Sequence, residues 1–93
     1  MTRIFAHALN TALALVYEAN QIIGGFARAS VAIDDDGSIF IYWRKAERNV
    51  ELKIPAKQQE KHHIYHREGI THGIERHVTA ATLAKWLKWF MRV

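Results

Sequence analysis

A tight turn, Asp34-Asp35-Asp36-Gly37-Ser38, separates two runs in which apolar and polar residues alternate. Alternation with a period of two residues is typical of a β-strand that buries one face. Gly37 suits the turn because it lacks a Cβ and so tolerates a positive φ. The segment therefore predicts a β-hairpin, and the length of its loop decides which side chains share a face.

Two loop lengths fit this turn, and they give different faces. A two-residue loop pairs Ile33 with Phe40 and leaves Ile39 opposite Asp34, which mixes apolar and charged side chains. A three-residue loop, with Gly37 at the left-handed position of a bulge, pairs Ile33 with Ile39 and collects the apolar side chains on one face. We predict the three-residue loop, in which Asp34 is expected to accept hydrogen bonds from the following backbone.

Strict alternation continues through residues 49–54 and extends the hairpin to a third strand. If Val50 lies opposite Trp43, across a loop over residues 45–48, the third strand adds its apolar residues to the same face. Pro55 lacks an amide donor and is expected to end this strand. The apolar face of the predicted meander then consists of Val31, Ile33, Ile39, Ile41, Trp43, Val50, Leu52 and Ile54.

Two helices are predicted at the ends of the chain. From Thr2 to Ile23 apolar residues recur at helical spacing, and Gly24-Gly25 supplies the stop. The predicted apolar side consists of Ile4, Phe5, Ala8, Leu9, Ala12, Leu13, Val16, Ala19, Ile22 and Ile23. The polar side of this helix carries Arg3, His7, Asn10, Glu18 and Gln21. In the second helix Thr79 is the predicted N-cap, with a buried stripe of Ala80, Leu83, Ala84, Leu87, Phe90 and Met91. Trp86 and Trp89 cannot both occupy the centre of that stripe, so we expect at least one indole at its margin or at a contact with another chain.

The segment between the meander and the second helix is predicted as a loop over residues 56–60 and a second hairpin over residues 61–77. With Glu68-Gly69 as the turn, Tyr65 faces His72. The predicted fold is α+β: an antiparallel β-meander of three to five strands, with the N-terminal and C-terminal helices packed on one face. A chain of 93 residues, 49% of them hydrophobic, forms a single domain over residues 1–93.

Composition excludes several classes of protein. The chain has no cysteine, which excludes disulfides, thiolate zinc sites and cysteine nucleophiles. Polar residues interrupt the N-terminal apolar stretch, so no signal peptide is predicted, and no apolar run of about 18 residues exists to span a membrane. We expect a cytoplasmic protein with no membrane partner.

The formal net charge of +4 is unevenly distributed, because the second half of the chain holds most of the excess lysine and arginine. That half also holds five of the six histidines, so it becomes more basic below about pH 6.5. The charge mildly favours acidic partners.

Phe40 and Tyr42 are predicted on the face of the sheet opposite the helices, where Lys53 and Arg44 accompany them. Exposed aromatic residues of this kind can close a homodimer, stack nucleic acid bases, or serve as strand formers shielded by their neighbours. We expect a non-enzymatic interaction or regulatory module, self-associating as a homo-oligomer or binding another protein. The candidate contact residues are Phe40, Tyr42, Arg44, Lys53, Trp86 and Trp89.

A nucleic-acid-binding protein is the alternative from a different class. Stacking on aromatic side chains together with cationic phosphate contacts is how open sheets hold single strands. Lys45 and Arg48 would join the residues above, whereas Glu47 and Glu51 dilute the basic character. No recognised RNA-binding signature is present.

A histidine-based metal binder is the third hypothesis. Five histidines fall close together in the sequence: His62, His63, His66, His72 and His77. In the predicted hairpin, however, His63 faces Ile74 and is at best a diagonal neighbour of His72, so three converging ligands are not evident and no metal site or cofactor is predicted. No phosphate loop, nucleophile elbow or zinc-protease helix is present, so no catalytic residue is predicted either.

Overall fold

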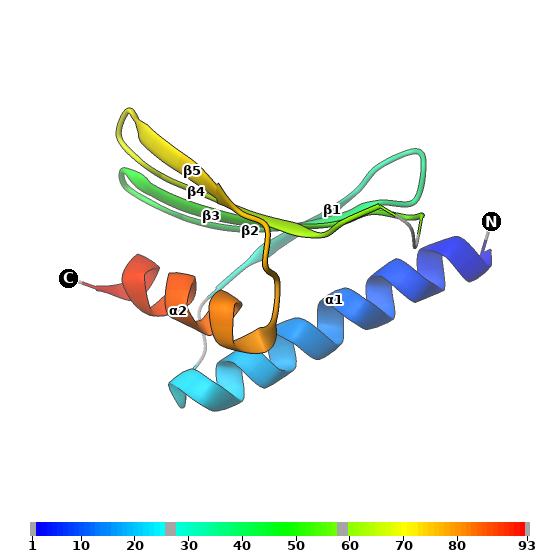
Figure 1. Ribbon diagram of the computed structural model, residues 1–93, viewed down its shortest axis with the longest axis horizontal. Coiled ribbons are helices and arrows are strands. Elements are labelled where there is room, and N and C mark those ends of the chain that lie inside the picture. Colours follow the sequence, from blue (N-terminus) through cyan, green and yellow to red (C-terminus); the bar gives the residue numbers. More distant parts are fainter. Residues whose placement is uncertain (1, 26–27, 58–59, 93) are drawn as a thin grey trace.

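The computed structural model describes residues 2–25, 28–57 and 60–92, with side chains described from residue 7 onward (Figure 1). The helices are α1 (Thr2–Ile23) and α2 (Ala80–Met91). The strands are β1 (Ser30–Ile33), β2 (Ile39–Lys45), β3 (Arg48–Ile54), β4 (His63–Glu68) and β5 (Thr71–Glu75). Within these ranges the element order agrees with the prediction, and both strands of the second hairpin are present.

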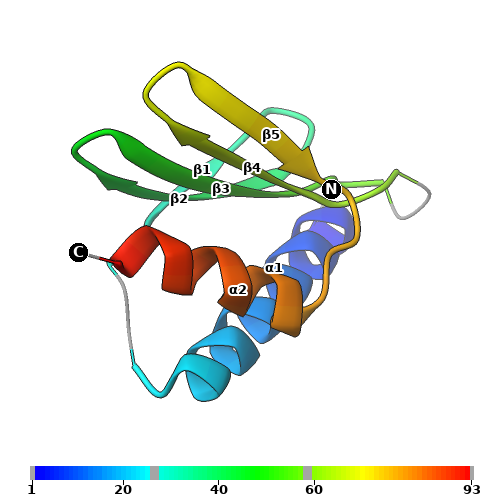
Figure 2. The same ribbon diagram turned by 60° about the vertical axis from the view of Figure 1, so that its left-hand side comes forward.

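The strands form one five-stranded antiparallel sheet in the order β1-β2-β3-β4-β5, so every strand neighbours the next one in the chain. Both helices lie on the same side of this sheet, and no other element of the described residues covers the opposite side (Figures 1 and 2). The α+β prediction is therefore confirmed. We call the side covered by the helices the inner face and the opposite side the outer face.

The turn between β1 and β2 has the predicted three-residue loop. Ile33 pairs with Ile39, and the Gly37 φ of 92° provides the left-handed position. The Gly37 amide donates to the Asp34 carbonyl over 2.9 Å. The side-chain acceptor differs from the prediction: the Asp36 carboxylate, rather than that of Asp34, accepts from the Ser38 amide over 2.9 Å. This bond lowers the pKa of Asp36, because it stabilises the ionised carboxylate.

The register between β2 and β3 also agrees with the prediction, since Val50 lies opposite Trp43. The strands continue to the pair Lys45 and Arg48, so the connection is a tight turn of Ala46 and Glu47. Ala46 takes a positive φ of 49° to make this turn. Strand β3 ends at Ile54, immediately before Pro55, as predicted.

The register predicted for the second hairpin is wrong by two residues. Tyr65 lies opposite Ile74 and not opposite His72. The turn is Gly69-Ile70, with Gly69 at a φ of 61°, so the glycine occupies the first central position and not the second. That position suits glycine in a type II′ hairpin turn. A shift of two residues keeps each side chain on its predicted face and changes only its partner.

The hydrophobic core lies between the inner face and the helices. Trp43 is its largest member and is 1% exposed. The other buried side chains of the sheet are Ile39, Ile41, Val50, Leu52, Ile54 and Ile64. Helix α1 contributes the small residues Ala8, Ala12 and Ala19, and α2 contributes Leu83, Ala84, Leu87 and Phe90. Alanine at the contact lets a helix approach a sheet of large side chains closely.

Part of the predicted apolar face is not buried. Val31 and Ile33 belong to the inner face by their pairing with Ile41 and Ile39, yet they are 58% and 54% exposed. Helix α1 packs mainly against β2, β3 and α2, so its cover does not extend over β1. Leu13 on the predicted apolar side of α1 is exposed as well. The side chains of Ile4 and Phe5, also predicted there, lie outside the described part.

The ends of the helices have the expected capping groups. The Gly24 amide, at a φ of 69°, donates to the Asn20 carbonyl over 3.0 Å and ends α1. At the start of α2, the Thr79 hydroxyl accepts from the Thr82 amide over 3.1 Å, and the Thr82 hydroxyl accepts from the Thr79 amide over 2.8 Å. This capping box satisfies two amides that the helix leaves free. Neither helix, over the described residues, has the combination of length and hydropathy needed to cross a membrane.

Candidate functional site

The outer face of the sheet is the candidate site, because alternate residues of the strands place a mixture of aromatic and cationic side chains on it. The central strands β2, β3 and β4 supply Phe40, Tyr42, Arg44, Asn49, Glu51, Lys53, His63, Tyr65 and Arg67. The edge strands add Ser30, Ala32, His72 and Ile74. All five strands of the sheet therefore contribute to this face.

Phe40 and Tyr42 form a stacked pair on β2, with ring centroids 6.4 Å apart and planes inclined by 11°. Each ring has a cation beside it. The Lys53 ammonium lies 5.4 Å from the Phe40 centroid, and the Arg44 guanidinium lies 5.0 Å from that of Tyr42. The structure thus brings together four of the residues singled out from the sequence. The rings are half-buried rather than fully exposed, since the cations cover part of them.

Tyr65 on β4 extends the aromatic surface across the sheet, and it was missed in the sequence reasoning. It lies opposite Glu51, and its ring stacks on that of His72 with centroids 5.9 Å apart. The signal was available in the alternation of residues 63–67, which puts Tyr65 and Arg67 on one face. A depression of about 180 Å³ lies between β2 and β4, lined by Tyr42, Arg44, Asn49, Val50, Glu51, Tyr65 and Arg67.

The charge on the outer face is positive. Three permanent cations of the strands, Arg44, Lys53 and Arg67, stand against the single carboxylate of Glu51. Burial raises the pKa of Glu51 by disfavouring its charged form, and the nearby Arg44 and Lys53 oppose this shift. With the Asn49 amide oriented so that its oxygen faces Arg67, that oxygen accepts from Nη2 over 2.9 Å. This bond holds the Arg67 guanidinium on the face.

Trp86 and Trp89 do not belong to the outer face. They lie half-buried at the margin of the α2 stripe and pack edge to face, with centroids 5.5 Å apart and planes at 83°. The His66 ring stacks on Trp86 at 3.6 Å, and Arg48 lies 5.2 Å from the Trp89 centroid. Both indoles therefore pack against the core of the fold, and of the two expected places, the margin of the stripe or a contact with another chain, the structure shows the margin.

His66 is held between the sheet and α2. A Cβ on Gly73 would lie 2.8 Å from His66 Cε1, so the ring fits only because residue 73 is glycine. Burial lowers the pKa of His66, the carboxylate of Glu75 acts in the opposite direction, and Lys85 and His72 lower it further. Trp86 Nε1 reaches the Glu75 carboxylate at 3.5 Å. The arrangement favours a neutral imidazole and a packing role.

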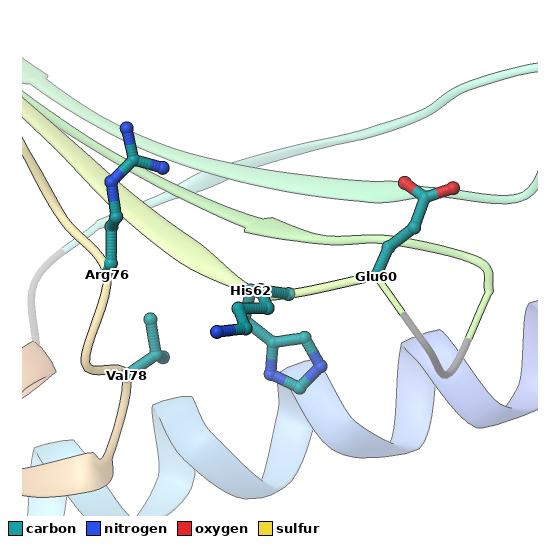
Figure 3. A pocket seen from close by; sticks show the side chains of 5 residues that line it. Glu60, His62, Arg76 and Val78 are labelled. Carbon is teal, nitrogen blue, oxygen red and sulfur yellow. The ribbon is translucent and has the colours of Figure 1, made fainter.

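The histidines are spread over different surfaces. His66 faces inward, His63 and His72 lie on the outer face, and His62 lines a pocket of about 250 Å³ with Glu60, Lys61, Arg76 and Val78. In Figure 3 the His62 ring points toward α1, whereas Glu60 and Arg76 point away from it. Burial and the nearby His7 lower the pKa of His62. Among the described residues, no three histidine, aspartate or glutamate side chains gather closely enough to hold a metal ion.

Arg48 occupies a second depression, of about 540 Å³, between the tips of the hairpins and the end of α2. Its Nη1 donates to the carbonyls of Trp89 and Arg92, each over 2.8 Å, and its Nε donates to Glu68 over 3.2 Å. The Trp89 carbonyl also accepts from the amide of Arg92, the C-cap residue, over 3.3 Å, so Arg48 adds a side-chain donor to the capped end of the helix. The residue predicted as a phosphate contact therefore serves the fold.

No model of a protein family matches the chain, and no curated protein and no solved structure matches it either.

Proposed function

We propose that the protein is a non-enzymatic binding module whose outer face holds single-stranded nucleic acid. The observation that supports this proposal is the presence of three aromatic rings and three permanent cations on one open sheet face. The rings are those of Phe40, Tyr42 and Tyr65, and the cations are Arg44, Lys53 and Arg67.

The placement of the cations suits a nucleotide. A single strand presents a flat base and an anionic phosphate at each step, and stacking on side-chain rings tolerates any base. Here the Arg44 guanidinium lies near the Tyr42 ring and the Lys53 ammonium near the Phe40 ring, so each outer-face ring of β2 has a cation next to it. The depression between Tyr42 and Tyr65 offers room for one unstacked base. Glu51 at its centre is an acceptor for an exocyclic amino group.

Self-association through the same face fits the charges less well. A two-fold axis through the outer face would bring Arg44, Lys53 and Arg67 of one copy toward those of the other, with only Glu51 to offset them. Like charges brought together across an interface oppose binding. An anionic partner meets no such opposition.

We place the activity in the cytoplasm, because a chain without cysteine has no need of an oxidising compartment.

The test is fluorescence anisotropy with labelled single-stranded DNA and RNA, measured over a range of salt concentrations. Three phosphate contacts predict a slope of about −2 for the logarithm of the association constant against that of the salt concentration. Arg44→Gln/Arg67→Gln leaves one contact and should reduce the slope to about −0.7. Tyr65→Ala should weaken binding by about 1–3 kcal/mol through the loss of one stacking platform.

Lys57→Gln/Lys88→Gln is the matched control, because it removes two exposed lysines that lie in the loop after β3 and on α2, away from the outer face. Thermal unfolding of every variant shows whether the fold is kept. Absence of binding to either nucleic acid at low salt contradicts the proposal. So does an equal loss of affinity in the control pair and in Arg44→Gln/Arg67→Gln.

A further inference from the structure

Strand β1 has an open backbone edge. It is the first strand of the sheet, and within the described ranges only β2 pairs with it. The Asp34 amide donates over 2.9 Å to the carbonyl of Ser38, the residue before β2. The Asp34 amide therefore points toward β2. Because amide directions alternate along an antiparallel strand, those of Val31 and Ile33 point away from β2. An unpaired edge of this kind is a template for another strand.

The side chains at this edge are apolar on the inner face. Val31 is 58% exposed and Ile33 is 54% exposed, whereas their partners Ile41 and Ile39 are buried. Proteins usually protect an edge with lysine, proline or an inward-pointing charge. Strand β5, at the other edge, carries the acidic Glu75 on its inner face. Strand β1 is short, with 4 residues, but none of these protective side chains lies within Ser30–Ile33.

Charges flank β1 in a self-complementary way. Arg28 and Asp34 are both exposed, and they lie at equal distances in sequence before and after Val31. In an antiparallel pair of β1 strands related by a two-fold axis through Val31, each Arg28 lies opposite the Asp34 of the other copy. The same register makes Val31, Ile33 and Ala29 the hydrogen-bonding residues of the new ladder, which matches the free amides of Val31 and Ile33. Backbone, apolar side chains and charges all agree on this register.

We propose that β1 pairs antiparallel with β1 of a second copy of this chain. The two five-stranded sheets then join into one continuous sheet, with opposite charges paired at both ends of the junction. A second copy of the chain is the partner that fits this edge, because the two sides of a two-fold interface must complement each other. Arg28 and Asp34 meet this requirement, since they lie at equal distances on either side of Val31. The junction is separate from the outer-face side chains of β2 to β4, which stay open in the dimer.

The oligomeric state tests this proposal, measured by light scattering and by sedimentation over a range of protein concentrations. The wild type should have twice the mass of one chain. Ile33→Lys should raise the dissociation constant of the dimer at least about tenfold, because it places a charge on the inner face of the junction. Ile74→Lys, at an exposed position of β5, is the matched control and should leave the dimer intact.

Charge reversal tests the register. Arg28→Glu and Asp34→Lys should each weaken the dimer by creating like-charge pairs, and the double variant should restore it. Circular dichroism confirms that each variant keeps its fold. A wild type that stays monomeric at its highest soluble concentration overturns the proposal and leaves the edge to another partner. The proposal is also overturned if the dimer persists in Ile33→Lys, or if the double charge reversal does not restore the dimer. Either result would place the interface elsewhere.

Discussion

At the scale of single residues, Ala46 carries backbone strain that a glycine would relieve. Its φ of 49° lies in the left-handed region, where a Cβ meets the backbone and costs about 1 kcal/mol or more. Ala46→Gly should therefore raise the free energy of unfolding by roughly 0.5–1 kcal/mol. Urea denaturation measures the change. Ala81→Gly, at an exposed position of α2, is the control and should lower the same quantity by about 1 kcal/mol. Equal losses in both variants would contradict the assignment.

Gly73 makes room for the His66 ring. A Cβ at this position would lie 2.8 Å from His66 Cε1, so Gly73→Ala must displace the imidazole from Trp86. We expect the substitution to cost about 1–3 kcal/mol of stability. In a His66→Ala background the clash is gone, and the same substitution should cost clearly less. Additive losses in the double-mutant cycle would show that the two residues do not compete for this space.

The pKa of His66 gives stability a defined dependence on pH. Burial lowers this pKa, so the unfolded chain takes up a proton at a higher pH than the folded one. The contribution of His66 is therefore fully present above its unfolded pKa of about 6.5 and is lost as the pH falls toward the folded value. His62 and His63, whose pKa values burial also lowers, act in the same direction. Denaturation between neutral and acid pH should show a decline that is shallower in His66→Gln. An unchanged pH dependence in that variant would exclude His66 as a source.

At the scale of elements, Arg48 connects the sheet to the end of α2. Its guanidinium donates through Nη1 to the carbonyls of Trp89 and Arg92 and through Nε to Glu68, and the single nitrogen of the lysine ammonium does not reproduce contacts made from two nitrogens. Arg48→Lys should lower the free energy of unfolding by about 1–2 kcal/mol. Glu68→Gln removes only the exposed ion pair and should cost less than about 0.5 kcal/mol. Denaturation curves that reverse this order would show that the ion pair, and not the helix end, is the important contact.

The first hairpin shows what could be predicted from sequence at this scale. Its register followed from alternation, because of the two loops that fit the turn only the three-residue loop collects the apolar side chains on one face. The second hairpin offered no equivalent constraint, because glycine suits either central position of a tight turn. Two tertiary contacts accompany the observed register: the Gly69 amide donates to the Glu47 carbonyl over 3.1 Å, and Gly73 lies against His66. Neither contact is visible in a local pattern.

The candidate site was predictable in part for the same reason. Phe40, Tyr42, Arg44 and Lys53 share a face through the well-determined pairing of β2 with β3. Tyr65 and Arg67 join them because β4 pairs with β3, and the sequence carries no turn signal that sets this alignment. The exposure of Val31 and Ile33 could not be predicted, because it depends on where α1 crosses the sheet.

At the scale of the whole molecule, both helices lie on one side of the sheet, so the residues that form the core and the residues of the candidate site lie on opposite faces. The inner face builds the core around Trp43, so the outer face is free to carry polar and aromatic side chains without loss of packing. The open edge of β1 is a third surface, separate from the core and from the candidate site of the outer face. Binding on the outer face and pairing through β1 are therefore expected to be independent: Ile33→Lys should leave the salt dependence of nucleic acid binding unchanged.

The most direct test of the central claim is an NMR titration of the labelled protein with a single-stranded oligonucleotide at low salt. Binding through the outer face predicts chemical shift changes at the side chains and amides of Tyr42, Arg44, Tyr65 and Arg67, with α1 and the solvent side of α2 unaffected. Shift changes concentrated on the helices, or a spectrum that does not change on adding the oligonucleotide, would contradict it.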